Sequence, residues 1–517
     1  MVSWTSGAIS KSSGSRCVTA DDADACNGTN RTAIARSQVV NRRIGIAFRP
    51  GAREAYRRPV PLCDDGPFRG EGRAMTERAP MSAEEIVEKS KRYTLYDWQA
   101  QSKATPIPVD RAEGVYFWDA DGKRYLDFNS QLMGVNIGHG DKRVADAIAR
   151  QAEKLPYISP FHAYETRARL GEKLASLWPG DLEKTFFTLG GAEANENAIR
   201  IAKAFTGRQK VLARYRSYHG ATYATVNLTG DPRRWANENP PMPGVVHVLD
   251  PYHGTARGTE DAGIALANLE ETIELEGPST IAAFILEPVT GTNGILIPPD
   301  GYLEGVRDVC SRHGIVLIAD EVMCGFGRTG EWFAVNHWGV VPDLMSAAKG
   351  LTSSYLPLGA VAIRPDIAES FEEKVFFGGL TYNSHPLSCA AAIAAIGVLE
   401  EDDLVGNAKR LDPVMRRHHE GLMAKHPSVG RIRNIGLFGI IELVKSRETM
   451  EPMSPFNVVN ETMQSVNKRM LERGLYTMIR FNGIMTNPPL CISEEQLEDG
   501  FAIIDEALEE ADAAVEG

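Results

Sequence analysis

Two charged residues in the middle of the chain follow short apolar runs. The run Ile315 to Ala319 leads into Asp320 and Glu321. A second short run begins after Asp343 and leads to Lys349. Bounded apolar runs of this length are typical of buried strands, although periodicity alone does not exclude a helix. Because ligands of open α/β sheets bind beyond the carboxyl ends of the strands, the sequence predicts that Asp320 and Lys349 belong to one site.

The neighbours of Lys349 suit a reactive amine. Most lysines and aspartates are solvated and have no specific role, but Lys349 lies between the small, mostly apolar run Met345 to Ala348 and Gly350. Burial there would lower the pKa of the amine, as Schiff-base chemistry with a carbonyl cofactor requires. Asp320 would need a cationic partner to stay ionised, and a protonated pyridine nitrogen is such a partner. At an effective dielectric of about 20 their attraction is roughly 4–5 kcal/mol, comparable with the desolvation cost that it offsets.

The segment Val316 to Gly350 resembles part of the class III (ω-type) aminotransferases, which are pyridoxal 5′-phosphate enzymes of fold type I. Asp320-Glu321-Val322, Arg328-Thr329-Gly330 and Lys349 carry the resemblance, which extends from about Tyr93 to the C-terminus. It implies an α/β fold with a large domain, whose mostly parallel central sheet is flanked by helices, and a smaller α/β domain from the N- and C-terminal segments. The expected boundaries are 75–134 for the N-terminal segment of the small domain, 135–398 for the large cofactor-binding domain and 399–517 for the C-terminal small domain.

Residues 1–74 do not match the rest of the chain. They are rich in Ser, Gly, Arg and Ala and have no long apolar stretch, which argues against a secretory signal. Their Arg and Ser content is similar to that of a transit peptide, but acids such as Asp21, Asp22 and Asp64 argue against one. We expect a non-native upstream translation before a natural start at Met75 or Met81, with a disordered extension as the alternative.

The composition argues against several classes of binding partner. A net charge of −12 argues against nucleic-acid binding and against a cationic membrane-binding surface. No apolar run approaches ~20 residues, so no membrane span is expected. The seven cysteines are odd in number and scattered, without a C-x-x-C pair. This favours free thiols in a reducing cytoplasm over disulfides or a metal site.

A glycine-rich turn between a predicted strand and helix suits a phosphate. The strand covers Thr185 to Leu189, and Gly190 to Glu196 opens a helix that ends at about Phe205. Free N–H groups and the helix dipole at such a turn favour an anion, although a plain helix cap is the alternative. The turn is similar to the family's S-G-S/T-E-A-N-E motif, with Gly191 and Ala192 at the Gly and Ser/Thr positions. Because Ala192 lacks a hydroxyl donor, we expect the backbone amides to bind the phosphate either more weakly or together with another group.

The resemblance implies further cofactor contacts. Tyr218 and His219 occupy the family's Y-H-G motif, where the aromatic ring stacks on the cofactor; we read His219 as structural and not as a general base. Val322 would cover the opposite face of the ring. Glu287 ends the predicted strand Ile281 to Leu286, near the cofactor, and can pair with a mobile arginine. Thr381, in a segment similar to F-T-Y-S-x-H-P, would reach the phosphate of a neighbouring subunit.

Three residues are candidates for binding substrate. Met133 and Val135 lie in the loop 129–140, which lines the substrate pocket in the family, although ordinary core packing explains them equally well. Arg480 ends a predicted strand over Leu475 to Ile479 and would bind a substrate carboxylate, a bidentate task suited to guanidinium; a surface arginine is the alternative. His418 and His419 are expected on a solvated helix face.

These features predict a transaminase that moves an amino group from an ω-amine or amino acid donor to a keto acid, with pyruvate as the preferred acceptor. Lys349 would hold pyridoxal 5′-phosphate and shuttle a proton, while Asp320 would keep the ring nitrogen protonated. A 2-oxoglutarate-dependent 4-aminobutyrate-type enzyme and an aminomutase or decarboxylase on the same scaffold remain alternatives. We expect a homodimer, or a dimer of dimers, with active sites at the interface.

Overall fold

The computed structural model describes residues 81–237, 242–252 and 260–515. The prediction for residues 1–74 lies outside these ranges. The described helices, α1 to α13 in chain order, are Ala83–Tyr93, Ser130–Met133, Lys142–Lys154, Glu165–Ala175, Gly191–Thr206, Tyr223–Leu228, Ala262–Glu276, Tyr302–His313, Pro365–Glu369, Pro386–Glu401, Leu404–Lys425, Glu461–Glu472 and Glu494–Asp512. None of the helices in these ranges is long and apolar enough to cross a bilayer.

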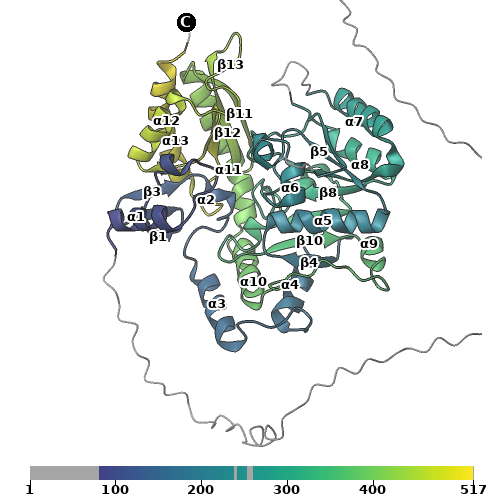
Figure 1. Cartoon of the computed structure of the whole chain (residues 1–517). Coiled ribbons are helices and arrows are strands. Elements are labelled where there is room, and N and C mark those ends of the chain that lie inside the picture. The colour runs from purple at the N-terminus through teal and green to yellow at the C-terminus, as the bar shows by residue number, and fades with distance from the viewer. Residues whose placement is uncertain (1–80, 238–241, 253–259, 516–517) are drawn as a thin grey trace, which may run out of the picture. The chain divides into compact units, whose positions relative to one another are not determined.

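A seven-stranded sheet forms the centre of the described chain (Figure 1). Its order is β4-β10-β9-β8-β7-β5-β6; β10 runs antiparallel to both neighbours and the other pairs are parallel. The predicted α/β fold with a mostly parallel sheet is confirmed. The strands are β4 Lys184–Thr188, β5 Lys210–Arg214, β6 Val245–Val248, β7 Ile281–Leu286, β8 Val316–Asp320, β9 Leu344–Ala347 and β10 Gly359–Ile363.

Helices cover both faces of this sheet, which explains why its central strands are apolar throughout. Every residue of β7, β8, β9 and β10 is buried, as expected when neither face meets water. Side chains alternate along β7: Ala283 and Ile285 pack in a cluster with α5, whereas Phe284 and Leu286 pack with α7 and α8. The sheet is therefore the middle of three layers.

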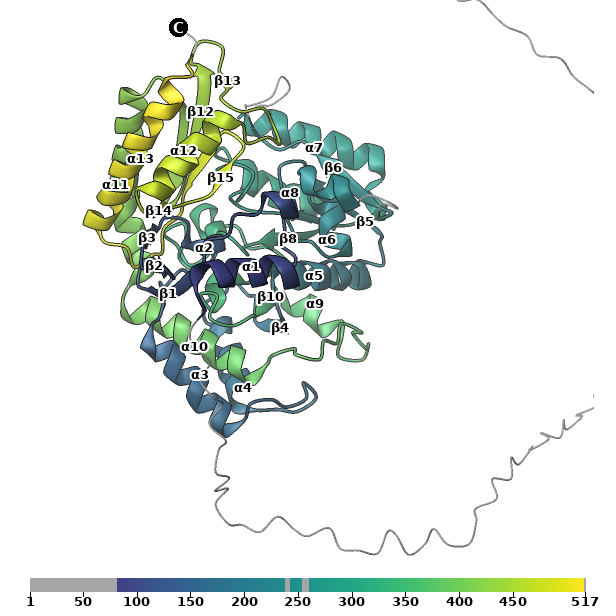
Figure 2. The ribbon, with the colours of Figure 1, turned by 60° about the vertical axis from the view of Figure 1, so that its left-hand side comes forward.

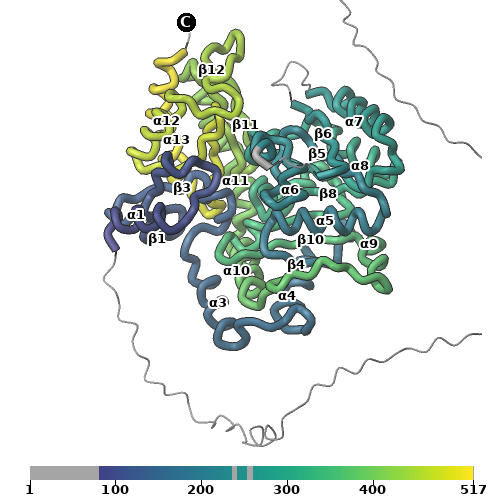
Figure 3. Tube along the Cα trace, in the orientation of Figure 1, coloured from purple at the N-terminus to yellow at the C-terminus, as the bar shows by residue number. Residues whose placement is uncertain are grey.

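Two smaller sheets contain the remaining strands, and one of them joins segments from the two ends of the described chain (Figure 2). In the first, the strand order is β1-β2-β3-β14, and β14 pairs in parallel with β3, so segments from opposite ends of the chain lie side by side (Figure 3). The second has the order β11-β12-β16-β15, with β13 paired to β12. The strands are β1 Val109–Glu113, β2 Tyr116–Asp119, β3 Arg124–Asp127, β11 Val429–Ile435, β12 Phe438–Ser446, β13 Glu451–Pro452, β14 Leu475–Tyr476, β15 Ile479–Arg480 and β16 Gly483–Thr486.

Two predictions in the C-terminal region are wrong. The single strand predicted over Leu475 to Ile479 is divided, because β14 pairs with β3 whereas β15 pairs with β16. His419 is fully buried, and its Nε2 lies 3.1 Å from Thr486 Oγ1. His418 is half-buried and stacks on Phe501. The pair is not solvated because α11 packs against α13 and β11.

Candidate active site

Asp320 and Lys349 line the same cavity, which has a volume of about 480 Å³. Asp320 is the last residue of β8, and Lys349 follows the end of β9 by two residues. β8 and β9 are adjacent and parallel, so their carboxyl ends meet at one edge of the sheet. A cavity of this size and position is typical of a small-molecule site in an open α/β sheet.

Lys349 is held in an unusual backbone conformation. Its φ is +44°, in the left-handed region that non-glycine residues rarely adopt and that is enriched at functional sites. The neighbouring Gly350 packs closely against Asn136, because a Cβ atom at this position would lie 2.5 Å from Asn136 Nδ2. Desolvation lowers the pKa of Lys349 to about 8, while the charges of Asp320 and Glu287 act in the opposite direction. A large fraction of its amines is therefore neutral near pH 8.

The Asp320 carboxylate is positioned by three donors and is 3% exposed. Its Oδ2 accepts a hydrogen bond from Asn195 Nδ2 at 2.7 Å and lies 2.8 Å from His219 Nδ1. Its Oδ1 accepts from the backbone N–H of Val322 at 3.1 Å. Oδ1 thus retains acceptor capacity toward the cavity that Asp320 lines. The sequence prediction did not assign Asn195 a role, although it lies in the predicted A-N-E turn.

The second acid of the pair, Glu321, is structural. It is fully buried and accepts hydrogen bonds from the N–H groups of Ala334 and Val335 at 3.0 and 2.8 Å. Desolvation raises its pKa to about 7, although these two hydrogen bonds act to lower it. It does not line the cavity, so only one acid of the pair faces the site.

Arg328, in the Arg-Thr-Gly part of the motif, is also structural. It is fully buried and donates to the carbonyl oxygens of Leu437 and Pro488 and, at 2.8 Å, to Ser130 Oγ. Burial lowers its pKa to about 9. It therefore connects the start of α2 to the C-terminal region.

Glu287 lines the cavity but does not hold Arg480. Its carboxylate accepts from the N–H groups of Tyr218 at 3.0 Å and Gly291 at 2.7 Å. Desolvation raises its pKa. Arg480 also lines the cavity, and its Nη2 instead donates to Asp231 at 2.9 Å. The sequence offered no signal for Asp231, which lies in a polar loop.

Small residues form one wall of the cavity. Gly191 packs so closely on Val322 that a Cβ there would lie 2.6 Å from Val322 Cγ1, and Gly220 faces Ala192 equally closely. α5 begins at Gly191, and among the described residues no side chain caps its N–H groups. Those N–H groups are available to an anion. Ala192 adds no hydroxyl, as predicted from its type.

The remaining predicted residues lie in three places: the cavity wall, the core and the surface. Met133, 2% exposed and with φ at +54°, lines the cavity together with Tyr218 and His219. Val135 is buried but does not line it. Thr381 is exposed and lies outside the cavity; its carbonyl oxygen accepts from the Tyr157 hydroxyl at 2.9 Å. Within one described chain, Thr381 is therefore separate from the other predicted residues.

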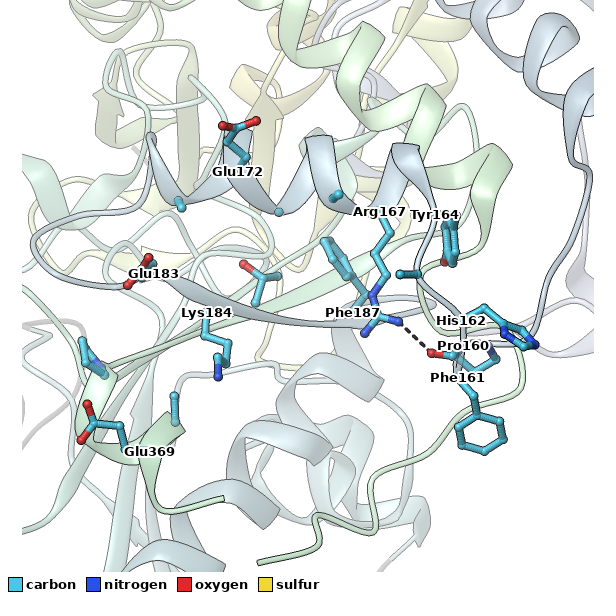
Figure 4. Close-up of a pocket in the computed structure, with 17 residues that line it drawn as sticks. Pro160, Phe161, His162, Tyr164, Arg167, Glu172, Glu183, Lys184, Phe187 and Glu369 are labelled. Atoms are coloured by element: carbon cyan, nitrogen blue, oxygen red, sulfur yellow. Dashed lines mark hydrogen bonds between the residues drawn. The ribbon is translucent and has the colours of Figure 1, made fainter. Parts of the chain in front are cut away.

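A second hollow of about 810 Å³ lies elsewhere, between the loop 160–164, α4, β4 and α9 (Figure 4). Arg167 donates to the carbonyl oxygen of Pro160 across it, and Phe161 points away from α4. None of the predicted site residues lines this hollow. The smaller cavity is the candidate active site because the lysine, the buried acid and the helix N-terminus converge there.

Comparison with known proteins agrees with this geometry. The family description "Aminotransferase class-III" matches residues 98–508. A putrescine–pyruvate aminotransferase of Pseudomonas aeruginosa is 33% identical over 448 residues, which are 81% of this chain and 97% of that protein. A mitochondrial gamma-aminobutyrate transaminase 1 of Oryza sativa subsp. indica is 33% identical over 439 residues, which are 81% and 84% of the two chains.

Solved structures are similar over the same region. A taurine:2-oxoglutarate aminotransferase of Bifidobacterium kashiwanohense, in complex with PLP and glutamate, has a TM-score of 0.82 and 39% identity, covering 85% of this chain and 100% of that one. An (S)-enantioselective omega-transaminase of Thermomicrobium roseum has a TM-score of 0.79 and 35% identity, covering 84% and 99%. The chain therefore belongs to the class III aminotransferases, enzymes that use pyridoxal 5′-phosphate.

Proposed function

We propose that the chain transfers an amino group from an ω-amine or amino acid donor to pyruvate. The observation that supports this activity is that Lys349, Asp320 and Arg480 line one cavity. They place a partly neutral amine, a fixed carboxylate and a guanidinium in the same site. Pyruvate as acceptor is supported by likeness to the putrescine–pyruvate aminotransferase. 2-Oxoglutarate is a second candidate acceptor, because the chain is also similar to a taurine:2-oxoglutarate aminotransferase, at 39% identity.

The residues of the cavity fit pyridoxal 5′-phosphate. When bound, this cofactor supplies an electrophilic carbonyl and a pyridine ring that withdraws electrons from the substrate. Asp320 has acceptor capacity left for a protonated ring nitrogen, and Tyr218 and Val322 would cover the ring. The N–H groups at Gly191 and Ala192 would bind the phosphate, with Glu287 and His219 holding Tyr218 and Asp320 in place.

Lys349 performs the proton transfer in this proposal. Its Nζ would hold the cofactor's carbonyl carbon until a substrate amine takes that position. Once free, Nζ would be the group that accepts a proton from the substrate carbon and donates it again on the cofactor side. Desolvation favours the neutral amine that this step needs. Arg480 binds the carboxylate of the keto acid in the second half-reaction.

The proposal predicts a pH dependence for cofactor attachment. Only the neutral amine attacks a carbonyl, and burial lowers the pKa of Lys349 from 10.5 to about 8. The rate at which apoenzyme takes up pyridoxal 5′-phosphate should therefore rise about tenfold per pH unit below pH 8 and level off above it. Stopped-flow absorbance measures this rate. A rate that still climbs at pH 10, as for a free lysine derivative run as the control, would contradict the lowered pKa.

We also propose that the enzyme is a homodimer in a reducing, cytoplasmic compartment. Thr381 is exposed outside the cavity, so it can reach a phosphate only in a second copy of the chain. Phe161 and Phe377 are 96% and 81% exposed, which suits a surface that a second copy covers. The cysteines among the described residues are free thiols. Light scattering should give at least twice the chain mass of 56.6 kDa; an active monomer would contradict the role of Thr381.

A panel of donors and acceptors tests the proposed activity. Purified enzyme loaded with pyridoxal 5′-phosphate would receive putrescine, 4-aminobutyrate, taurine or butylamine with either pyruvate or 2-oxoglutarate. We expect alanine to form from pyruvate with at least one of the amines. Formation of glutamate alone would favour the second candidate, and no transfer between any pair would contradict a transaminase acting on these substrates.

A further inference from the structure

The segment between β3 and α3, which contains α2, has a backbone conformation that is unusual for its residue types. Ser130, Gln131 and Met133 have φ values of +48°, +56° and +54°, a region that side chains other than glycine disfavour. Gln131 combines its φ with a ψ of −102°, close to the first central residue of a type II′ turn, where glycine is usual. Such a conformation persists only where its surroundings hold it. We call residues 129–134 the strained loop.

One buried carboxylate, that of Asp127, holds the strained loop. Asp127 ends β3 and is fully buried. Its Oδ1 and Oδ2 accept from the N–H of Gln131 at 3.0 and 2.9 Å, and Oδ2 also accepts from Gln131 Nε2 at 2.9 Å. The N–H of Asn129 donates to Oδ1 at 3.2 Å, and His139 Nε2 lies 2.9 Å from Oδ2. Both the backbone N–H and the side-chain amide of Gln131 are thus bound by the same acid.

The strained loop forms part of the cavity wall and packs against the turn that carries the reactive amine. Leu132 and Met133 line the cavity. A Cβ atom at Gly134 would lie 3.3 Å from Lys349 Cβ. The turn that begins at Lys349 is strained as well, with φ values of +44° at Lys349 and +60° at Ser354. Two strained segments therefore lie against each other beside the site of the chemistry.

We propose that Asp127 is a positioning residue that holds Gln131 in its glycine-like conformation. It thereby fixes Leu132 and Met133 as a rigid wall of the substrate pocket. Asp127 itself does not line the cavity, so it acts through the strained loop. Asparagine cannot replace it, because an amide has only one acceptor oxygen and its NH₂ group would face the N–H of Gln131. The inference rests on the proposed transaminase function.

Asp127→Asn tests the proposal through the size of the amino donor. Butylamine and cyclohexylmethylamine are both primary amines with no other charged group, and they differ in bulk. In the variant, kcat/KM for butylamine divided by kcat/KM for cyclohexylmethylamine should fall about fivefold or more, because a released wall leaves more room for the bulkier donor. A loss of folded enzyme alone would lower both values equally. An unchanged ratio would overturn the proposal.

Glycine at position 131 isolates the contribution of backbone strain. Because glycine adopts a positive φ without a steric cost, the strained loop of Gln131→Gly does not need the carboxylate. In that background Asp127→Asn should change the ratio by less than about twofold. An equal fall in both backgrounds would overturn the proposal, since Asp127 would then act by a route other than the conformation of Gln131.

A second substitution decides the matter if Asp127→Asn does not fold. Gln131→Val keeps the carboxylate but places a β-branched residue, which tolerates a positive φ poorly, in the strained loop. It should lower the same ratio by about fivefold. A ratio equal to that of the wild type in this variant would overturn the proposal.

Hydrogen exchange followed by mass spectrometry tests the strained loop without turnover. In Asp127→Asn, peptides that cover 129–134 and 349–354 should exchange about tenfold faster than in the wild type, because the two segments pack against each other. Peptides from β7 and β8 should exchange at the same rate in both proteins. Unchanged exchange at 129–134, or equally faster exchange throughout the chain, would overturn the proposal.

Asp119 provides the matched control. It ends β2 and is 8% exposed, and its Oδ1 accepts from the N–H groups of Asp121 and Lys123 at 3.1 and 2.8 Å, in a turn that does not line the cavity. Asp119→Asn should lower the Tm without altering the ratio of the two donors. If the wild type binds pyridoxal 5′-phosphate but transfers no amino group, the proposed function fails, and hydrogen exchange still tests the strained loop. If the wild type transfers amino groups and Asp127→Asn leaves the ratio unchanged, only the role of Asp127 fails.

Discussion

Lys349→Ala is expected to abolish covalent attachment of pyridoxal 5′-phosphate and to lower kcat by about 10⁴-fold or more, because the same amine holds the cofactor and moves the proton. The visible absorbance of the bound cofactor and the rate of alanine formation measure the two effects. The side chain reaches the cavity just beyond the end of β9 and makes no hydrogen bond to another described residue, so its removal should leave the fold intact.

A surface lysine provides the control for this prediction. Lys142 is exposed and pairs with Asp146 one helical turn away, an arrangement worth little in stability or activity. Lys142→Ala should retain full cofactor absorbance and turnover. If Lys349→Ala kept the cofactor attached and remained within tenfold of wild-type activity, another amine would have to hold the cofactor and transfer the proton.

Asp320→Asn should retain the cofactor but lose about 10³-fold in kcat. Asparagine keeps a hydrogen-bonding side chain of the same size, but it removes the negative charge that stabilises a protonated ring nitrogen. An attraction of about 4 kcal/mol at an effective dielectric near 20 corresponds to roughly three factors of ten in rate. Single-turnover kinetics of the donor half-reaction would measure the loss.

The matched control for Asp320 lies at the opposite end of the neighbouring strand. Asp343 precedes β9, is 3% exposed and pairs with Arg307 and Arg364. Asp343→Asn should lower the Tm, because it breaks buried ion pairs, with little change in kcat. Near-normal rates in Asp320→Asn, or an equal loss of kcat in both variants, would contradict an electronic role for Asp320.

The central sheet and the two main residues of the site could be predicted because their signals are local. Asp320 and Lys349 each follow a short apolar run, and parallel strands bring the ends of such runs to one edge. The glycine-rich start of α5 is equally local. The same motif did not reveal that Glu321 and Arg328 are structural, since both roles depend on backbone groups elsewhere in the chain.

The rest depends on contacts between distant segments. Asp231 and Arg480 are separated by 249 positions, and nothing in either loop predicts their pairing. His419 is buried because α11 packs on α13 and β11. Its neighbours in the sequence are polar, so the sequence pattern does not predict this burial. The predicted strand after Gly474 divides because its two halves join different sheets. Periodicity describes each segment by itself and carries no information about these partners.

The most direct test of the central claim is to identify the amine that holds the cofactor. Enzyme saturated with pyridoxal 5′-phosphate is reduced with borohydride, which fixes the cofactor to that amine, and the protein is then digested and its peptides are analysed by mass spectrometry. We predict that the added mass of the reduced cofactor lies on Lys349 alone. Added mass on a different lysine, or none on any peptide of saturated enzyme, would contradict the assignment of the active site.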